Sequence, residues 1–334
     1  MEDKISVIVA TYNQEETIAR TLDSVLMQQC HVPIEIILGE DCSTDGTLAV
    51  CQHYANEHPD VIRLIANKQN KGLVDNYFDC ILAAQGKYIA DCAGDDFWTD
   101  PLKLEKEVCV MEQHPNVTMV LTRWNWFNET TKQITPGPTP PFPDGIIKGD
   151  EMLEAIVTQT NMNVYHLCTS LYRRDVFMKA YKEYPQLFRN KELATEDIQV
   201  AFMMALHGNI AYLPDVTMNY SIGKESASNT ADDEKQFHFI RKIMNLCYYL
   251  TQQYQIHSSN VDSFFSRRLF ALSMHAFRTH RPELYQETLK CEKEWQVRPT
   301  MAIRLAYTVM RHEWLWQMML KVRLLYVAMK RRFS

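Results

Sequence analysis

One stretch, residues 88–98 with the sequence YIADCAGDDFW, decides the fold. Its apolar start is too short for a buried helix, and the glycine and paired aspartates that follow predict a central strand ending in an acidic turn. In an open α/β sheet, ligands bind beyond the carboxyl ends of the strands. The carboxylates of Asp95 and Asp96 would repel each other there unless solvent, hydrogen bonds or a cation such as Mg²⁺ or Mn²⁺ offset their charge. The plainer alternative is an acidic loop whose second aspartate helps to start the next helix.

The residues before this stretch alternate between apolar and amphipathic segments. Continuous β-branched or apolar runs predict strands over residues 5–10, 34–38 and 61–66. Helical spacing of apolar residues predicts helices over residues 18–29, 46–58 and 73–85. Asn13 and Glu16 resemble an N-cap and its capping box at the start of the first helix. Strands and helices that alternate with short joins predict an α/β fold with a doubly wound, mostly parallel sheet.

The later part of the chain has two characters. Up to about residue 230, predicted helices at 100–113, 150–158, 175–182 and 196–208 alternate with strands at 118–122, 124–128, 164–172 and 210–220. Residues 135–145 contain five prolines and are predicted to form a long mobile loop, either a lid or a linker. From about residue 232 the pattern is helical throughout. We therefore predict a catalytic domain at 1–230, with halves at 1–104 and 105–230, and a helical region at 231–334.

Composition narrows the class of protein. A net charge of −6 argues against a nucleic-acid binder, which would normally show a basic face. Nine scattered cysteines without a CxxC pair indicate reduced thiols rather than a disulfide framework or a zinc site. The first apolar run is too short for a signal peptide, and no run is long enough to span a membrane. The sequence therefore predicts a cytoplasmic chain.

The last predicted helix, residues 319–333, combines bulky apolar side chains with a basic cluster. Such a helix can lie in the interface of an anionic membrane. It can equally pack on a core and leave a solvated basic end. The sequence leaves both interpretations open.

Three strand exits place polar side chains along one predicted edge of the sheet. They carry Thr11 with Tyr12, then Asp41, then Asp95 with Asp96. The ring of Tyr12 suits stacking on a nucleobase, and Asp41 suits accepting a ring N–H. Asp95 and Asp96 suit ribose hydroxyls and a metal-bound diphosphate. Taken singly, Tyr12 is more simply explained as a packed aromatic and Asp41 as a turn cap.

Four motifs in order resemble the family-2 inverting glycosyltransferases with the GT-A fold. They are residues 6–13 (SVIVATYN), residues 40–47 (EDCSTDGT), the NKG at 70–72 with Asn76, and residues 86–104 (GKYIADCAGDDFWTDPLKL). The resemblance spans residues 5–104 and continues more weakly to about residue 228. It implies a GT-A fold and a nucleotide-sugar donor, usually a UDP-sugar. It also implies roles on the donor side: Thr11, Tyr12 and Asp41 would hold the base, Asp95 would contact the ribose or sugar, and Asp96 would ligate a divalent metal, Mn²⁺ or Mg²⁺.

A second acidic motif, Thr195-Glu196-Asp197, looks like the motif that this family carries at a helix start. The resemblance would make Asp197 the catalytic base, with Glu196 as a supporting neighbour. Alternatively, both carboxylates only stabilise the first turn of a helix through its dipole.

The chain departs from the family pattern at two places. Ala93 stands where many members have a further aspartate. Residues 220–223 read YSIG where Tyr-Arg-x-His is usual in the family. The histidine that could help to hold the metal or the diphosphate is therefore missing, and either Lys224 or no residue takes its role. Glu15 and Gly94 are further supporting candidates at the strand exits.

The predicted reaction is displacement at the anomeric carbon of a nucleotide sugar by an acceptor hydroxyl. The resemblance suggests a glycan or lipid-linked glycan acceptor in cell-surface polysaccharide biosynthesis. The C-terminal helix would then contact the cytoplasmic face of the inner membrane. Two alternatives stay open: a sugar-1-phosphate nucleotidyltransferase, which should carry a glycine-rich basic loop after the first strand, and a non-catalytic scaffold of the same fold.

Overall fold

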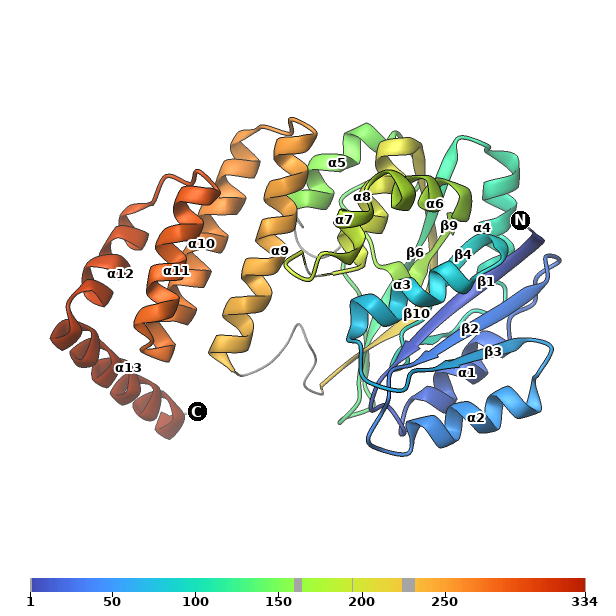
Figure 1. Ribbon diagram of the computed structural model, residues 1–334, viewed down its shortest axis with the longest axis horizontal. Coiled ribbons are helices and arrows are strands. Elements are labelled where there is room, and N and C mark those ends of the chain that lie inside the picture. The colour runs from blue at the N-terminus through green and yellow to red at the C-terminus, as the bar shows by residue number, and fades with distance from the viewer. Residues whose placement is uncertain (1, 159–163, 194, 224–231, 334) are drawn as a thin grey trace. The chain divides into compact units, whose positions relative to one another are not determined.

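The structure, a computed structural model, describes residues 2–158, 164–193, 195–223 and 232–333. The chain divides into two compact units (Figure 1). We call residues 1–191 with 195–224 the sheet unit, and residues 192–194 with 225–334 the helical unit.

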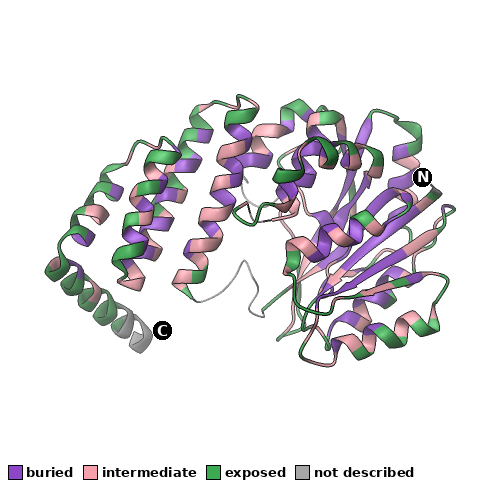
Figure 2. Ribbon diagram, in the orientation of Figure 1, coloured by how far each residue is buried: buried purple, intermediate pink, exposed green. Residues whose placement is uncertain are grey.

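The first half of the sheet unit is the predicted parallel sheet. Its strands are β1 (Glu2–Thr11), β2 (Ile34–Glu40), β3 (Ile62–Ala66) and β4 (Gly86–Asp91), in the spatial order β3-β2-β1-β4. Neighbouring strands pair in parallel. The crossover helices are α1 (Ile18–Leu26), α2 (Thr47–Glu57) and α3 (Leu73–Ala83). Apolar side chains such as Val7, Ile36 and Ala90 are fully buried, as expected for strands covered on both faces (Figure 2).

The second half extends the same sheet with mixed pairing. The order continues through β9 (Ser170–Arg173), β6 (Val117–Asn128), β10 (Asn209–Ile222) and β5 (Phe97–Trp98). β9 runs antiparallel to both β4 and β6, whereas β6 and β10 are parallel. Two short strands, β7 (Ile134–Pro136) and β8 (Gly145–Ile147), pair with β6 and β10. The predicted fold class, an α/β sheet with a parallel first half followed by a helical region, is confirmed.

The helices of this second half cover the extended sheet. They are α4 (Lys103–Gln113), α5 (Gly149–Thr158), α6 (Arg174–Glu183), α7 (Pro185–Arg189) and α8 (Asp197–His207), and a short 3₁₀ helix, η2 (Leu167–Thr169), precedes β9. Every residue of α8 from Ile198 to Ala205 is buried. A helix that is apolar on all sides belongs to the interior, so the start of α8 is held firmly in place.

Several predicted boundaries were wrong. The two strands expected at 118–122 and 124–128 are one strand, β6. The strand expected at 164–172 is limited to β9, because η2 takes up residues 167–169. The helix expected to start at Asp100 begins at Lys103, since the Asp100 carboxylate accepts a hydrogen bond from Leu102 N (2.9 Å) and closes a turn instead.

The N-cap predicted at Asn13 was also wrong. Thr17 is the N-cap of α1, and Asn13 lies in the left-handed region with φ of 52°. Its side-chain oxygen accepts a hydrogen bond from Thr44 N (2.8 Å), so Asn13 joins two loops rather than capping a helix.

The proline-rich segment at 135–145 is anchored at both ends. Its first residues belong to β7 and its last residue begins β8. Between them, Arg123 pairs with Asp144 (2.7 Å), and the ring of Phe142 stacks on Tyr212. The segment thus begins and ends in the sheet, and only its central residues form a loop.

The helical unit contains five described helices joined by short turns. They are α9 (Asp233–Gln253), α10 (Ser259–Thr279), α11 (Pro282–Glu294), α12 (Met301–Arg311) and α13 (Glu313–Phe333). Asp232, Ser258 and Thr300 cap three of them by accepting backbone N–H bonds. Trp316 Nε1 donates to Phe277 O (2.8 Å) and fixes α13 to α10. Among the described residues, every helix is too short or too polar to cross a membrane.

Candidate active site

The carboxyl ends of β1, β2 and β4 lie next to one another, because these strands are parallel neighbours. Asp41 N donates to Thr11 O (3.1 Å), and Gly94 N donates to Ala10 O (3.2 Å). The backbone therefore holds the ends of all three strands together. The structure thus brings the predicted donor-side residues to one edge of the sheet.

Gly94 is required by a close approach between two loops. A Cβ atom at this position would lie 2.3 Å from Gln14 Oε1 and 2.8 Å from Thr11 Oγ1. Thr11 is buried and its hydroxyl donates to Gln14 Oε1 (2.7 Å), while Thr17 Oγ1 donates to Gly94 O (2.9 Å). These bonds fix the acidic turn against residues 11–17.

Tyr12 differs from its neighbours because 45% of its surface is exposed. The ring is therefore available to stack on a planar ligand. Glu15, three residues later, accepts a hydrogen bond from Gly46 N through Oε2 (2.6 Å), and its own N–H donates to Asp45 Oδ2 (3.2 Å). Glu15 thus ties the loop after β1 to the loop after β2.

Asp41 is 2% exposed and already has three donors. Its carboxylate accepts hydrogen bonds from Asn67 Nδ2 (3.0 Å), Lys71 N (2.9 Å) and Gly72 N (2.8 Å). A carboxylate offers about four acceptor positions, so about one remains for a ligand N–H. Asp41 therefore also shapes the loop at 67–72, a role that the sequence did not suggest.

Asp95 and Asp96 form a poorly compensated acidic pair. Asp96 is 1% exposed, and its Oδ1 accepts one hydrogen bond from Ser221 N (2.9 Å). Burial, and then the charge of Asp95, raise the pKa of Asp96 well above its usual range. Burial likewise raises the pKa of Asp95. Carboxylates that are buried in this way call for a cation, and an oxygen-lined site of this kind fits a divalent metal.

The guanidinium of Arg20 lies near the carboxylates of Asp95 and Asp96, but it donates its hydrogen bonds to other groups. Its Nη2 donates to the backbone oxygen of Asp95 (2.8 Å), to Glu129 (2.6 Å) and to Ser221 Oγ (3.2 Å). The guanidinium lies 4.2 Å from the centre of the Phe97 ring. Arg20 therefore positions the acidic turn without forming an ion pair with either aspartate side chain.

The second acidic motif lies at the N-terminus of α8. Asp197 is the first residue of this helix and Glu196 is its N-cap residue. Burial raises the pKa of Asp197 to about 6, so its carboxylate is mostly ionised at neutral pH. Burial and the adjacent Asp197 charge raise the pKa of Glu196 well above its usual range. The two carboxylates therefore differ in charge, and Asp197 is the one able to accept a proton.

Tyr220 connects the two acidic motifs. Burial raises the pKa of its hydroxyl, and the charges of Asp96, Asp95 and Asp197 raise it further. All three carboxylates therefore lie close enough to Tyr220 to affect it. Burial also raises the pKa of Asp91, at the end of β4, to about 8, with a smaller contribution from Asp197. The acidic turn and the start of α8 thus influence the same hydroxyl, that of Tyr220.

A family model described as glycosyl transferase family 2 matches residues 6–180, which is more than half of the chain. The chain belongs to this family.

Several curated relatives match about a third of this chain. Putative glycosyltransferase EpsE of Bacillus subtilis is 42% identical over 126 residues, which cover 38% of this chain and 45% of EpsE. Other curated relatives of similar identity are matched over about a third of their length.

Solved structures share the fold over most of the chain. TarS of Staphylococcus aureus in complex with UDP-GlcNAc has a TM-score of 0.62 at 19% identity, covering 90% of this chain and 81% of TarS. The mannosyltransferase PcManGT of Pyrobaculum calidifontis in complex with GDP-Man and Mn²⁺ has a TM-score of 0.54 at 13% identity. The match covers 96% of this chain and 87% of PcManGT. At these identities the likeness shows the fold alone.

This family-2 chain has two residues beside Asp96 that sequence reasoning missed, His166 and Cys168. Asp96, His166 and Cys168 each offer one possible ligand atom, and these three atoms all lie within 4.8 Å of one another. The imidazole packs against the rings of Tyr220 (4.8 Å) and Trp124 (5.4 Å), and burial lowers the pKa of His166 to about 4. No local motif marks these residues, because only the pairing of β9 with β4 brings them to the acidic turn.

The remaining candidates at the end of β10 differ in outcome. Ser221 belongs to residues 220–223, which differ from the family pattern. Its N donates to Asp96 Oδ1 and its Oγ donates to Asp95 O, contacts that the sequence did not suggest. Lys224 lies outside the described residues.

Proposed function

We propose that this chain is an inverting glycosyltransferase that transfers a sugar from a nucleotide-sugar donor, a UDP-sugar, to an acceptor hydroxyl. The observation that carries the proposal is that the charges of Asp95, Asp96 and Asp197 all raise the pKa of one hydroxyl, that of Tyr220, beside the acidic turn at the carboxyl edge of the sheet. Membership of glycosyl transferase family 2 supports it. The fold shared with TarS, whose structure contains UDP-GlcNAc, supports the choice of nucleotide.

Asp197 is the group that would accept the proton of the acceptor hydroxyl. Its pKa of about 6 keeps it ionised at neutral pH while leaving it basic enough to act as a general base. Glu196, with its higher pKa, would stay protonated beside it. A single displacement from the face opposite the nucleotide inverts the anomeric centre, as in inverting glycosidases.

The donor would lie along the strand exits. Tyr12 would stack on the base, Asp41 would accept its ring N–H, and Asp95 would contact the ribose or sugar. Asp96 would hold a divalent cation, Mn²⁺ or Mg²⁺, which supplies positive charge for the departing diphosphate when bound. The complex of PcManGT with GDP-Man and Mn²⁺ supports the choice of cation.

The acceptor is proposed to be a glycan or lipid-linked glycan of a cell-surface polysaccharide. An exposed apolar stripe on α13 supports membrane contact, because its members recur every three or four residues and so share one side of the helix. The stripe consists of Trp314, Met318, Val322, Leu325 and Met329. The exposed cations Lys321 and Arg323 lie on the same helix and suit anionic lipid at the cytoplasmic face of the membrane.

The experiment that tests this function is nucleotide release. The full chain is incubated with Mn²⁺ and a panel of nucleotide sugars, and free UDP is measured with and without glycan acceptors. We expect slow release from one UDP-sugar. Formation of a nucleoside triphosphate with pyrophosphate would instead indicate the nucleotidyltransferase, although the loop Thr11–Glu15 lacks the glycines and cations which that reaction needs. No release with any donor would favour the scaffold.

Asp197→Asn is the decisive variant for the mechanism. An amide cannot accept the acceptor proton, so we expect turnover to fall by about a hundredfold or more. Binding of the donor, measured by calorimetry, should stay within about twofold because Asp197 lies on the acceptor side of the proposed site. Asp175→Asn is the matched control, since Asp175 is an exposed first-turn aspartate of α6. Turnover of Asp197→Asn at the control's rate would remove Asp197 from the mechanism.

A further inference from the structure

We propose that Asp96, His166 and Cys168 form one cation-binding site, which prefers a borderline-soft divalent ion such as Co²⁺ or Zn²⁺ over Mg²⁺. The three residues offer one carboxylate oxygen, one ring nitrogen and one sulfur, all within 4.8 Å of one another. The three side chains define the cation site by themselves. The inference rests on the proposed function only for what the cation does to the donor.

Hydrogen bonds fix Cys168 against the acidic turn on both sides of Asp96. Ala93 N donates to Cys168 Sγ (3.3 Å), and Trp98 Nε1 donates to Cys168 O (2.9 Å). Thus Cys168 is bound by one residue three positions before Asp96 and by another two positions after it. The antiparallel pairing of β4 with β9 brings these segments together and keeps them there.

The spacing of the ligand atoms suits a single ion. Bonds of about 2.0–2.3 Å to oxygen, nitrogen and sulfur place two ligands of one ion roughly 3–4.5 Å apart. The three atoms are already within 4.8 Å, so small side-chain movements would complete the site. His166 Nδ1 accepts only a long hydrogen bond, 3.3 Å, from Cys168 N, and this bond is easily exchanged for a metal bond.

The charge around the site favours a cation. Asp96 and Cys168 are both buried, and the neighbouring Asp95 adds a second negative charge. The nearby guanidinium of Arg20 donates to backbone and to Glu129 rather than to these side chains. A divalent ion would offset the acidic pair, and Cys168 would bind it as a thiolate after releasing its proton to solvent.

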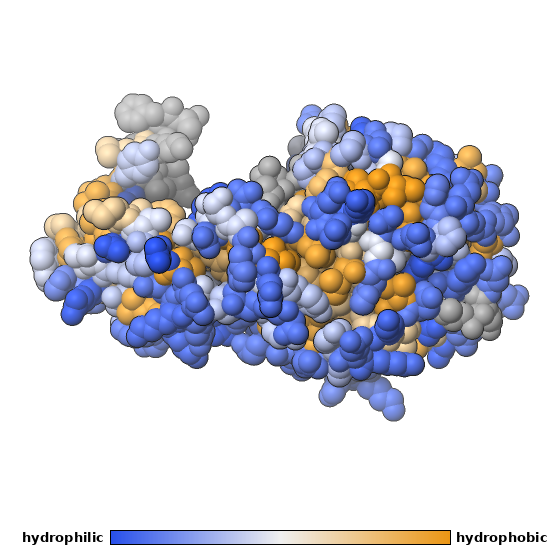
Figure 3. Space-filling view, turned by 90° about the horizontal axis from the view of Figure 1, so that it is seen from above, coloured by the Kyte–Doolittle hydropathy of each residue, from blue (hydrophilic) through white to orange (hydrophobic). Residues whose placement is uncertain are grey.

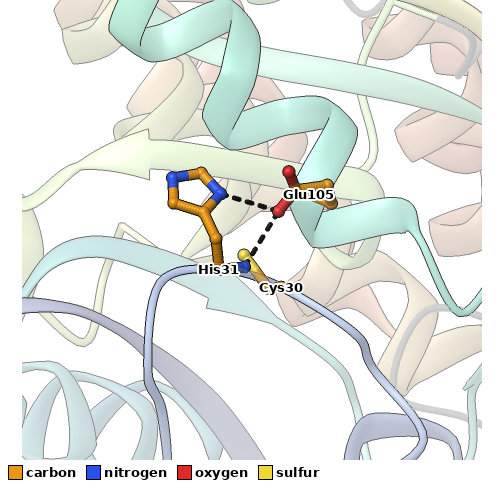
Figure 4. Close-up of side chains that lie close together, drawn as sticks. All are labelled: Cys30, His31 and Glu105. Atoms are coloured by element: carbon orange, nitrogen blue, oxygen red, sulfur yellow. Dashed lines mark hydrogen bonds and ion pairs between the residues drawn. The ribbon is translucent and has the colours of Figure 1, made fainter.

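The sulfur decides which ion is preferred. Mg²⁺ selects oxygen ligands, whereas a thiolate with an imidazole and a carboxylate selects Zn²⁺ and Co²⁺. A second cysteine, histidine and carboxylate set, Cys30, His31 and Glu105, provides a natural control (Figure 4). There Glu105 Oε2 accepts from His31 N (3.0 Å) and contacts His31 Nδ1 (2.8 Å), an ion pair that already satisfies the carboxylate. Cys30 and His31 lie before β2, at the opposite edge of the sheet from Asp96.

The test is a titration of the full chain with Co²⁺, followed by absorption spectroscopy. A thiolate on Co²⁺ gives a charge-transfer band in the near ultraviolet, which oxygen and nitrogen ligands do not give. We expect the band in the wild type and in Cys30→Ser, and its loss in Cys168→Ser. Calorimetry should show Co²⁺ bound about tenfold or more tightly than Mg²⁺ by the wild type. His166→Gln should keep the band and weaken Co²⁺ binding by roughly tenfold or more.

Each outcome bears on the site itself. A wild type without the band overturns the proposal whether or not any variant folds. A band that survives in Cys168→Ser and disappears in Cys30→Ser places the ion at the other cluster and also overturns it. If the band behaves as expected but no donor releases nucleotide, the cation site stands and the proposed function fails. If a UDP-sugar is turned over while Co²⁺ gives no band, the function stands and this site is wrong.

Discussion

The carboxylate of Asp197 makes the stability of the protein depend on pH. Burial raises its pKa from 3.8 to about 6, which means that the folded state holds this proton more tightly than the unfolded chain. Ionisation of Asp197 therefore lowers the free energy of unfolding. This loss of stability is absent below about pH 4, grows between pH 4 and 6, and is complete above about pH 6. We expect Asp197→Asn to stabilise the chain at pH 7 by roughly 1–2 kcal/mol, allowing for partial solvent screening, and to have no effect at pH 4.

Thermal unfolding at pH 4 and pH 7 checks this prediction. Asp175→Asn again serves as the control, because it makes the same chemical change at an exposed carboxylate. A lower melting temperature of Asp197→Asn at pH 7 would mean that hydrogen bonds favour the charged form, contrary to the effect of burial. The same pKa predicts that turnover of the wild type falls as the pH drops through about 6, since the base becomes protonated.

Residues were predictable from the sequence where the signal was local. Thr11, Asp41 and the pair at 95–96 each follow an apolar run, and the ends of parallel strands must meet at one edge. The three donors on the Asp41 carboxylate come from residues 26–31 positions away, so no local pattern could reveal them. His166 and Cys168 lie about 70 residues after Asp96, and only the pairing of β4 with β9 joins them.

At the scale of one helix, the exposed stripe on α13 leads to a prediction about membranes. Val322 and Leu325 are exposed on the same side of the helix, and a carboxylate at either position could not enter the apolar part of a bilayer. We expect the double variant Val322→Glu, Leu325→Glu to lose flotation with vesicles that contain anionic lipid, whereas the wild type floats. Figure 3 shows hydrophobic surface, in orange, among hydrophilic residues on the helical unit.

Leu324→Glu is the control for that experiment. Leu324 is as exposed as its neighbours, but at 100° per residue it lies away from the stripe. It adds one negative charge to the same helix, against two in the double variant, but outside the stripe, so its flotation should change little. Equal flotation of the wild type and the double variant would instead favour the interpretation of α13 as a plain terminal helix.

Elements were predicted well where a buried parallel strand dictated them. β1, β2 and β3 match their predicted runs closely, because continuous β-branched segments have few other uses. β6 was divided in the prediction at Arg123, whose charge interrupts the apolar pattern. In the structure Arg123 pairs with Asp144, so the strand continues through it. The strand predicted at 164–172 is limited to β9 because η2 takes up residues 167–169, and apolar periodicity does not distinguish a 3₁₀ turn from a strand.

At the scale of the whole molecule, the order of elements was enough to predict the parallel half of the sheet. Strand, helix and short join in alternation permit few topologies, and the observed order β3-β2-β1-β4 is one of them. The order β9-β6-β10-β5 was not predictable, because antiparallel strands inserted between parallel ones depend on long-range pairing. The insertion of β9 brings His166 and Cys168 close to Asp96 in the acidic turn.

The net charge of −6 leads to a final prediction about the donor. An acidic protein repels a nucleotide diphosphate at long range, so the affinity must come from a bound cation and local donors rather than from the overall field. We expect a chelator to weaken UDP binding by about tenfold or more, and added Mn²⁺ to restore it. Raising the salt from 50 to 200 mM should change the affinity by less than about threefold, unlike the roughly 10³-fold or larger losses of a basic protein that binds nucleic acid. Calorimetry of UDP binding, with and without chelator and at both salt concentrations, measures both effects. Binding that is indifferent to the chelator yet falls steeply with salt would show that side-chain cations, not a metal on Asp96, hold the diphosphate.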